Sequence, residues 1–269
     1  MGRQLMRSAF AAVVTFVAVA VAGCTTKAPD QPKPEPPPAG WPAQLDDFTI
    51  TWSAEPGIEL TTGAAVVVRA YEESYYLATI TDDDKYLYPG FVKAVEANQP
   101  GKRDGTEDLR PESSTSETWV GTARHQILSV TRSDRDVTVL VCAYLYGSAA
   151  KQQFDYAANV GSDFNLNSGI YPLRIGLRAP EDANTELPAQ EGPSRAPSDN
   201  VFGGWKVTSH QGGYMTTSRW DDYDRDQATC IEKAGGTPES RHFLPGGGYS
   251  RSDFPTLPAT PGWPEKPAS

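Results

Sequence analysis

Apolar side chains recur at every second position between residues 137 and 145, which is the strongest structural pattern in this chain. Such alternation is typical of strands that bury one face. We predict one strand over residues 117–131 and a second over residues 136–147, joined by a hairpin turn at residues 132–135. The apolar set of the second strand is Val137, Val139, Val141, Ala143 and Leu145. Shorter alternations predict further strands at residues 49–52, 171–177 and 205–210.

The region before this hairpin shows the helical period instead. Its apolar side chains recur three and four positions apart, so we predict a helix that Thr61 or Thr62 caps and that continues to Thr79. A second helix is predicted over residues 89–98, because proline is favoured in the first turn of a helix. A short helix is predicted over residues 226–234.

Two helices followed by a hairpin and further strands predict an α+β fold, with a curved antiparallel sheet packed against the N-terminal helices. We expect one globular domain over residues 44–243. Within it, the segment 212–243 carries the apolar side chains that we expect to cover the far face of the second hairpin strand. Glycine and proline predominate in residues 244–269, so this tail is predicted to be extended or disordered.

Four parts of the chain, taken in this order, carry a resemblance to a known fold: residues 65–71 with Tyr75-Tyr76, Tyr88-Pro89-Gly90-Phe91, and the hairpin segments 123–130 and 137–141. They resemble the cone-shaped nuclear transport factor 2-like fold, to which the polyketide-cyclase-like proteins also belong. The resemblance extends over residues 60–211 and implies a concave sheet that encloses a pocket together with the helices. The loops at residues 148–169 and 179–204 are long for that fold.

The first 26 residues resemble a bacterial lipoprotein signal. Arg3 and Arg7 precede an apolar run over residues 9–22, and the segment ends in Val21-Ala22-Gly23-Cys24. The apolar run is shorter than the roughly 20 residues of a membrane-spanning helix. The pattern therefore predicts a signal peptide over residues 1–23 and acylation of Cys24, which would anchor the chain in a lipid bilayer. An ordinary secretory signal cut at an alanine is the alternative.

Residues 24–43 are predicted to form a tether. Seven of the nineteen residues 25–43 are proline, which favours extended polyproline II. Removal of residues 1–23, which carry two arginines and no acidic residue, leaves 22 basic and 34 acidic residues and thus a formal net charge of −12. Such an acidic body repels nucleic acid, so we expect no nucleic-acid partner.

Two cysteines, Cys142 and Cys230, remain once Cys24 is acylated. Thiols outside the cytoplasm tend to oxidise, and two cysteines allow one intramolecular pairing. We therefore predict a Cys142–Cys230 disulfide. Two separate buried thiols are the alternative.

The register of the hairpin decides which of its polar residues lie on the apolar inner face. If Thr131 pairs with Asp136, Arg124 and Gln126 lie on that inner face. His125 then lies on the outer face. A shift by one residue would reverse these assignments.

In the predicted register, Arg124 and Gln126 are candidate pocket-lining residues together with Tyr75 of the first helix. A cation and two polar groups on an apolar wall would orient an anionic or polar ligand. The structural alternatives for Arg124 are an ion pair with Glu72 or Glu73, or extension of its charged end to the edge of the sheet.

The sequence contains none of the common hydrolase, nucleotide-binding or zinc motifs: Gly-x-Ser-x-Gly, the Walker loop, His-Glu-x-x-His and Cys-x-x-Cys. We assign no catalytic residue, cofactor or metal ligand. The expected function is that of a lipid-anchored protein on the extracytoplasmic face of the cell membrane, with a non-catalytic domain that binds an envelope protein or a small ligand. The alternatives are an enzyme of the ketosteroid-isomerase or cyclase type and an exclusion lipoprotein of a phage or plasmid.

Overall fold

The computed structural model describes residues 40–95, 109–111, 115–161, 166–182, 187–212, 220–241 and 243–265. The chain divides into two compact units, residues 1–36 and residues 37–269, and all described residues belong to the second unit. The predicted signal peptide, Cys24 and nearly all of the predicted tether lie outside the described residues.

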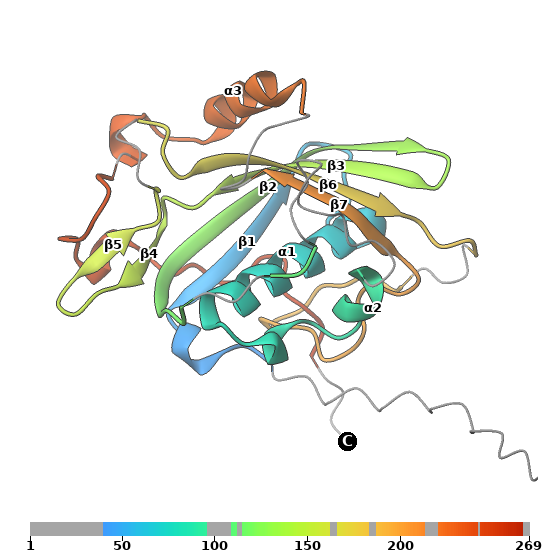
Figure 1. The fold of residues 1–269 in the computed structure, drawn as a ribbon, viewed down its shortest axis with the longest axis horizontal. Coiled ribbons are helices and arrows are strands. Elements are labelled where there is room, and N and C mark those ends of the chain that lie inside the picture. The colour runs from blue at the N-terminus through green and yellow to red at the C-terminus, as the bar shows by residue number, and fades with distance from the viewer. Residues whose placement is uncertain are drawn as a thin grey trace, which may run out of the picture. The chain divides into compact units, whose positions relative to one another are not determined.

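The described residues form an α+β fold built on a curved, unclosed sheet of seven strands, so the predicted α+β class and curved sheet are confirmed (Figure 1). The strand order is β5-β4-β2-β3-β6-β7, and β1 pairs with the edge of β2 that also carries β4. All pairs are antiparallel except β1 with β2. The strands are β1 (Phe48–Ala54), β2 (Trp119–Ser133), β3 (Asp136–Tyr144), β4 (Ser148–Lys151), β5 (Tyr156–Ala158), β6 (Ile170–Arg178) and β7 (Lys206–Gly212).

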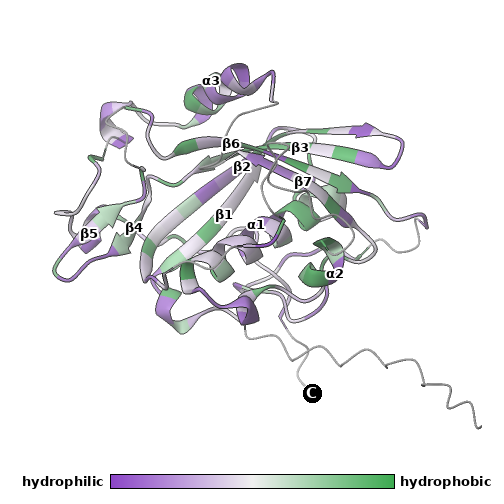
Figure 2. Ribbon diagram, viewed as in Figure 1, coloured by the Kyte–Doolittle hydropathy of each residue, from purple (hydrophilic) through white to green (hydrophobic). Residues whose placement is uncertain are grey.

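Helices α1 (Gly63–Thr81) and α2 (Phe91–Val95) lie on one side of the sheet, and α3 (Tyr223–Lys233) lies on the other (Figure 1). Figure 2 shows hydrophilic residues over most of α3 and hydrophobic ones over most of α2, whereas the strands carry both kinds. Single 3-10 turns complete the described elements: η1 (Ala43–Leu45), η2 (Asp84–Tyr86), η5 (Glu239–Arg241) and η6 (Arg251–Asp253).

Helix α1 begins and ends close to its predicted limits. Thr62 occupies the N-cap position with an extended backbone, although its side chain makes no capping hydrogen bond. At the other end Asp82 adopts the left-handed conformation with φ of 52°, and the Asp83 N–H bonds to the carbonyl oxygen of Ala78 at 3.2 Å. This closure satisfies carbonyl groups that the last turn leaves free. Of the second predicted helix, Phe91–Val95 is helical, and residues 96–98 lie outside the described residues.

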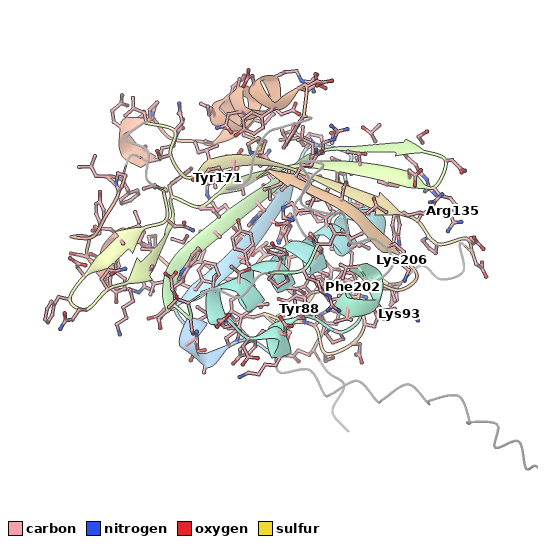
Figure 3. The ribbon with its side chains drawn as sticks, in the orientation of Figure 1. Tyr88, Lys93, Arg135, Tyr171, Phe202 and Lys206 are labelled. Atoms are coloured by element: carbon pink, nitrogen blue, oxygen red, sulfur yellow. A yellow bond between two sulfur atoms is a disulfide. The ribbon has the colours of Figure 1, made fainter. Side chains whose placement is uncertain are left out.

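Each face of the sheet has its own hydrophobic cluster. The inner cluster joins α1 and α2 to the sheet through residues such as Val68, Tyr71, Phe91, Val139 and Val141. The outer cluster joins α3 and the segment that follows it to the opposite face, and its members include Cys142, Tyr144, Cys230, Ala234 and Phe254. At the edge of the inner face, Lys206 of β7 donates a 2.7 Å hydrogen bond to the carbonyl oxygen of Lys93 in α2 (Figure 3).

The predicted register of the β2–β3 hairpin is wrong, and a β-bulge is the reason. The turn contains only Asp134 and Arg135, so Thr131 pairs with Thr138 instead of Asp136. This shift of two positions leaves the faces unchanged. A register shift between Ile127 and Ser129 then adds one residue to β2, and every side chain before it changes face.

Two regions predicted to lack regular or fixed structure are ordered elements of the fold. The insertion at residues 148–169 contains the β4–β5 hairpin, which pairs with the first residues of β2. The described part of the tail, residues 244–265, is packed against the body. Phe254 and Trp263 anchor it with 0% and 1% of their surface exposed. Burial of these two aromatic rings stabilises the packed tail despite its proline- and glycine-rich composition.

The predicted disulfide between Cys142 and Cys230 is confirmed. It joins β3 to α3 across 88 positions, with 5.4 Å between the Cα atoms and both residues fully buried. The alternative of two separate thiols is wrong. Because the bond lies in the outer cluster, it fixes α3 to the sheet.

Removal of this disulfide should lower the free energy of unfolding by up to about 4–5 kcal/mol, the value that the loss of chain entropy gives for a loop of this length. Urea unfolding of the Cys142→Ala/Cys230→Ala double variant measures the change. Wild-type protein with a reductant is the matched control and should behave like the variant. Two reactive thiols at these positions in denatured, unreduced protein would contradict the prediction.

Candidate functional site

Helix α1 buries polar side chains that a structural helix rarely buries. Arg69, Glu72, Glu73 and Ser74 are each at most 3% exposed. Charged side chains are almost never buried unless they are paired. Two groups of partners on the inner side of the sheet surround these residues, one around Glu73 and one around Glu72.

The Glu73 carboxylate accepts hydrogen bonds from three side chains in distant parts of the sequence. The Trp52 indole N–H donates at 2.8 Å, the Tyr88 hydroxyl at 2.9 Å and the Trp263 indole N–H at 2.7 Å. The pKa of Glu73 is raised, because the effect of burial outweighs the lowering by Arg69 and by the three donors. Because all three partners donate, the arrangement fits an ionised carboxylate. Tyr88 lies beside α1 in Figure 3.

The Arg69 guanidinium lies 4.4 Å from the centre of the Trp263 ring, so the same indole connects it to Glu73. Its two terminal nitrogens donate to four backbone carbonyl oxygens at 2.8–3.1 Å: those of Leu60, Gln190, Pro261 and Gly262. The hydrogen-bonding groups of Arg69 and Glu73 are therefore largely used to hold other segments in place, and we assign these two residues a structural role.

The second group surrounds His210 of β7. Its Nδ1 lies 3.2 Å from the oxygen of the Tyr71 hydroxyl. That hydroxyl donates to the carbonyl oxygen of Leu109 at 3.2 Å. Its Nε2 lies 3.7 Å from Oε1 of Glu72, and Tyr75 packs edge-on against the imidazole. Burial lowers the pKa of His210 to about 3, so its ring is neutral near pH 7. A buried carboxylate beside an imidazole and a phenol is an acid–base arrangement of a kind found in active sites.

His125 of β2 lies on the inner face, opposite to the prediction. Its ring stacks on Trp52 with centroids 4.6 Å apart, and Tyr76 packs edge-on at 5.7 Å. Neither ring nitrogen has a hydrogen-bond partner among the described residues. Burial lowers the pKa of His125 to about 3. In this position the imidazole acts as an aromatic packing surface and is a poor base.

The structure does not bring the three predicted pocket residues together. Tyr75 lies on the inner side of the sheet, beside His210. Arg124 and Gln126 pair with Tyr144 and Cys142, on the outer face, because of the bulge in β2.

On the outer face, Gln126 donates to Oε1 of Glu55 at 2.8 Å and accepts from the Tyr144 hydroxyl at 3.3 Å. Glu55 also accepts from Lys233, the last residue of α3, at 2.8 Å. Gln126 therefore belongs to a polar cluster between β1 and the end of α3.

Arg124 contacts α3 instead of a carboxylate. It donates to the carbonyl oxygen of Ala234 at 3.0 Å and to the Tyr146 hydroxyl, and it lies over the rings of Tyr144 and Tyr146. Arg241 donates to further carbonyl oxygens at the same helix end, those of Ile231, Gly235 and Gly236. Cations at a helix C-terminus satisfy free carbonyls and oppose the negative end of its dipole. Arg124 therefore fixes the position of α3.

A hollow at the start of α1 has a cavity volume of about 10 Å³. It contains neither the His210 group nor any charged side chain. This volume holds about one water molecule and is far below the range of small-molecule pockets. The lining residues are Thr62, Gly63, Val66, Val67, Leu187, Pro188, Val201 and Trp205.

Within the described ranges, no three His, Cys, Asp or Glu side chains are arranged to hold a metal ion. The helices of the same ranges are too short or too polar to span a membrane. Comparisons of the chain with protein-family models, with curated proteins and with solved structures found no match.

Buried neutral histidines make the free energy of unfolding depend on pH. From about pH 6.5 down to about pH 3, the unfolded chain protonates His125 and His210 and the folded chain does not. Stability is therefore lost as the pH falls, by about 1.4 kcal/mol per pH unit for each histidine. His125→Phe should reduce this slope by about 1.4 kcal/mol per pH unit in urea unfolding between about pH 4 and pH 6.

His210→Phe is the matched control for this experiment. It should reduce the slope by the same amount but should also lower stability at neutral pH, because it removes the contact with the Tyr71 hydroxyl. Identical pH profiles for wild type and His125→Phe would show that His125 is not a buried neutral group.

Proposed function

We propose that this chain is a lipid-anchored protein on the extracytoplasmic face of the cell membrane, whose body (residues 44–265) is a non-catalytic binding module. The acylated residue would be Cys24, and residues 24–43 would connect the lipid to the body. Its partner would be an envelope protein or a small ligand, and not nucleic acid.

The observation that carries this proposal is the buried disulfide between Cys142 and Cys230. Structural disulfides form and persist in oxidising compartments and are rare in the cytosol of most organisms. The disulfide and the sequence Val21-Ala22-Gly23-Cys24 are independent features that support the same location.

Binding is favoured over catalysis by the state of the two described histidines. Both are at most 4% exposed, and burial lowers the pKa of each to about 3. A general base works best with a pKa near the operating pH. Neutral, desolvated imidazoles suit packing and hydrogen bonding better than proton transfer.

We further propose that the body is cone-like, with the inner face of the sheet and α1 as the cone, and that residues 220–241 act as a cover over the outer face. The contacts that support a cover are the disulfide and the two arginines at the end of α3, Arg124 and Arg241. These bonds hold α3 to the outer side of the sheet.

An enzyme of the ketosteroid-isomerase or cyclase type is a second candidate, and the Glu72–His210 pair favours it. If that pair transfers protons, Glu72→Gln should abolish turnover of a substrate that the wild-type protein converts.

Metabolic labelling with a fatty-acid probe tests the proposed anchor. Wild-type protein should incorporate the probe and sediment with membranes, whereas Cys24→Ala should do neither, because the acyl chains need the cysteine. Cys230→Ala is the control, because it removes a cysteine that is not proposed to be acylated. Equal labelling of wild type and Cys24→Ala would refute the proposal.

A further inference from the structure

The last described segment of the chain forms a strap (residues 255–263) along the free edge of β1. The Thr49 hydroxyl donates to the carbonyl oxygen of Leu257 at 2.7 Å, and the Trp52 N–H donates to that of Thr260 at 2.7 Å. Trp263 exchanges two backbone hydrogen bonds with Ser194, at 2.8 and 3.0 Å. The strap therefore protects a strand edge that would otherwise be open.

The strap also contributes to the inner core. Trp263 is 1% exposed and gives Glu73 one of its three hydrogen-bond donors. Pro261 and Gly262 supply two of the four carbonyl oxygens that accept from Arg69. Both charged groups are buried, so each depends on a full set of partners.

Without the strap, the site that the Trp263 indole fills would be vacant. Glu73 would lose one hydrogen-bond donor and Arg69 two acceptors. Breaking the hydrogen bonds of a buried charge is among the most destabilising single changes in proteins. Natural domains have only a small margin of stability. Residues 40–254 alone are therefore not expected to hold the native fold.

We propose that the strap makes folding wait until the whole body has been synthesised. Residues 255–263 follow every other described element except residues 264–265, and chains are synthesised from the N-terminus. A chain that crosses a membrane unfolded would benefit from this delay, because its N-terminal segment is available for export before the body is stable. The benefit for export rests on the proposed function. The delay in folding does not depend on that function.

Ribosome-arrested full-length chains test the delay directly. A Gly/Ser linker after residue 269 would be made in two lengths. With the shorter linker, residue 254 has just left the ribosome and the strap is still inside it. With the longer linker, residue 269 has just left the ribosome and the strap is outside. Both chains would be translated without membranes, under oxidising conditions, and treated briefly with a protease. Cleavage follows the population of the open chain. The body should be digested at least about ten-fold more slowly with the longer linker.

Two variants with the longer linker make the result specific. Trp263→Ala should be digested as fast as the wild-type chain with the shorter linker. Leu257→Ala should remain protected, because that side chain is 47% exposed and the strap bonds there through its backbone.

Equal protection at both linker lengths, or protection at neither, would overturn the proposal. Equal digestion of Trp263→Ala and wild type with the longer linker would also overturn it. Fatty-acid labelling of Cys24 reports separately on export, so a labelled chain with length-independent protection refutes only the strap's role.

Discussion

A single buried carboxylate connects parts of the body that are far apart in the sequence. Glu73 accepts from Trp52 in β1, from Tyr88 after α1 and from Trp263 in the strap. An ionised group in this position is stable only if its donors remain in place, so the carboxylate requires a defined arrangement of all three segments. Arg69, one turn earlier on α1, applies the same constraint to the loops that contain Leu60 and Gln190. Helix α1 thus organises the inner side of the sheet through charge as well as through apolar packing.

The outer side of the sheet is held by different means. A disulfide joins Cys142 to Cys230, and two arginines bind the carbonyl groups at the end of α3. None of these groups is part of the Glu73 network. The two sides of the sheet therefore have independent sources of stability. Helix α3 is short and amphipathic and buries few residues of its own, so the disulfide and the two arginines hold it in place.

Much of the fold follows from the sequence pattern, and the exceptions have identifiable causes. Alternation located β2 and β3, and the small number of cysteines gave the disulfide. The bulge near Leu128 could not be predicted, because no glycine or proline marks its position in the sequence. It places Arg124 and Gln126 on the outer face and His125 on the inner one. The strap was not predicted, because the proline and glycine content of residues 244–269 is typical of a disordered tail. A single buried residue, Trp263, anchors the strap and has little effect on that composition. A useful signal was present in α1, where a charged pair four residues apart, Arg69 and Glu73, interrupts an apolar face.

The account depends most on the hydrogen bond between Glu73 and Trp263, and a double-mutant cycle measures it directly. Glu73→Met removes the acceptor, and Trp263→Phe removes the donor but keeps an aromatic ring. The effects of Glu73→Met on Trp52 and Tyr88 are common to both backgrounds and cancel in the cycle. Urea unfolding of the four proteins should give a coupling energy of about 1.5–3 kcal/mol, as for a hydrogen bond to a charged group. Additive effects, with a coupling below about 0.5 kcal/mol, would contradict the view that this carboxylate holds the strap in place.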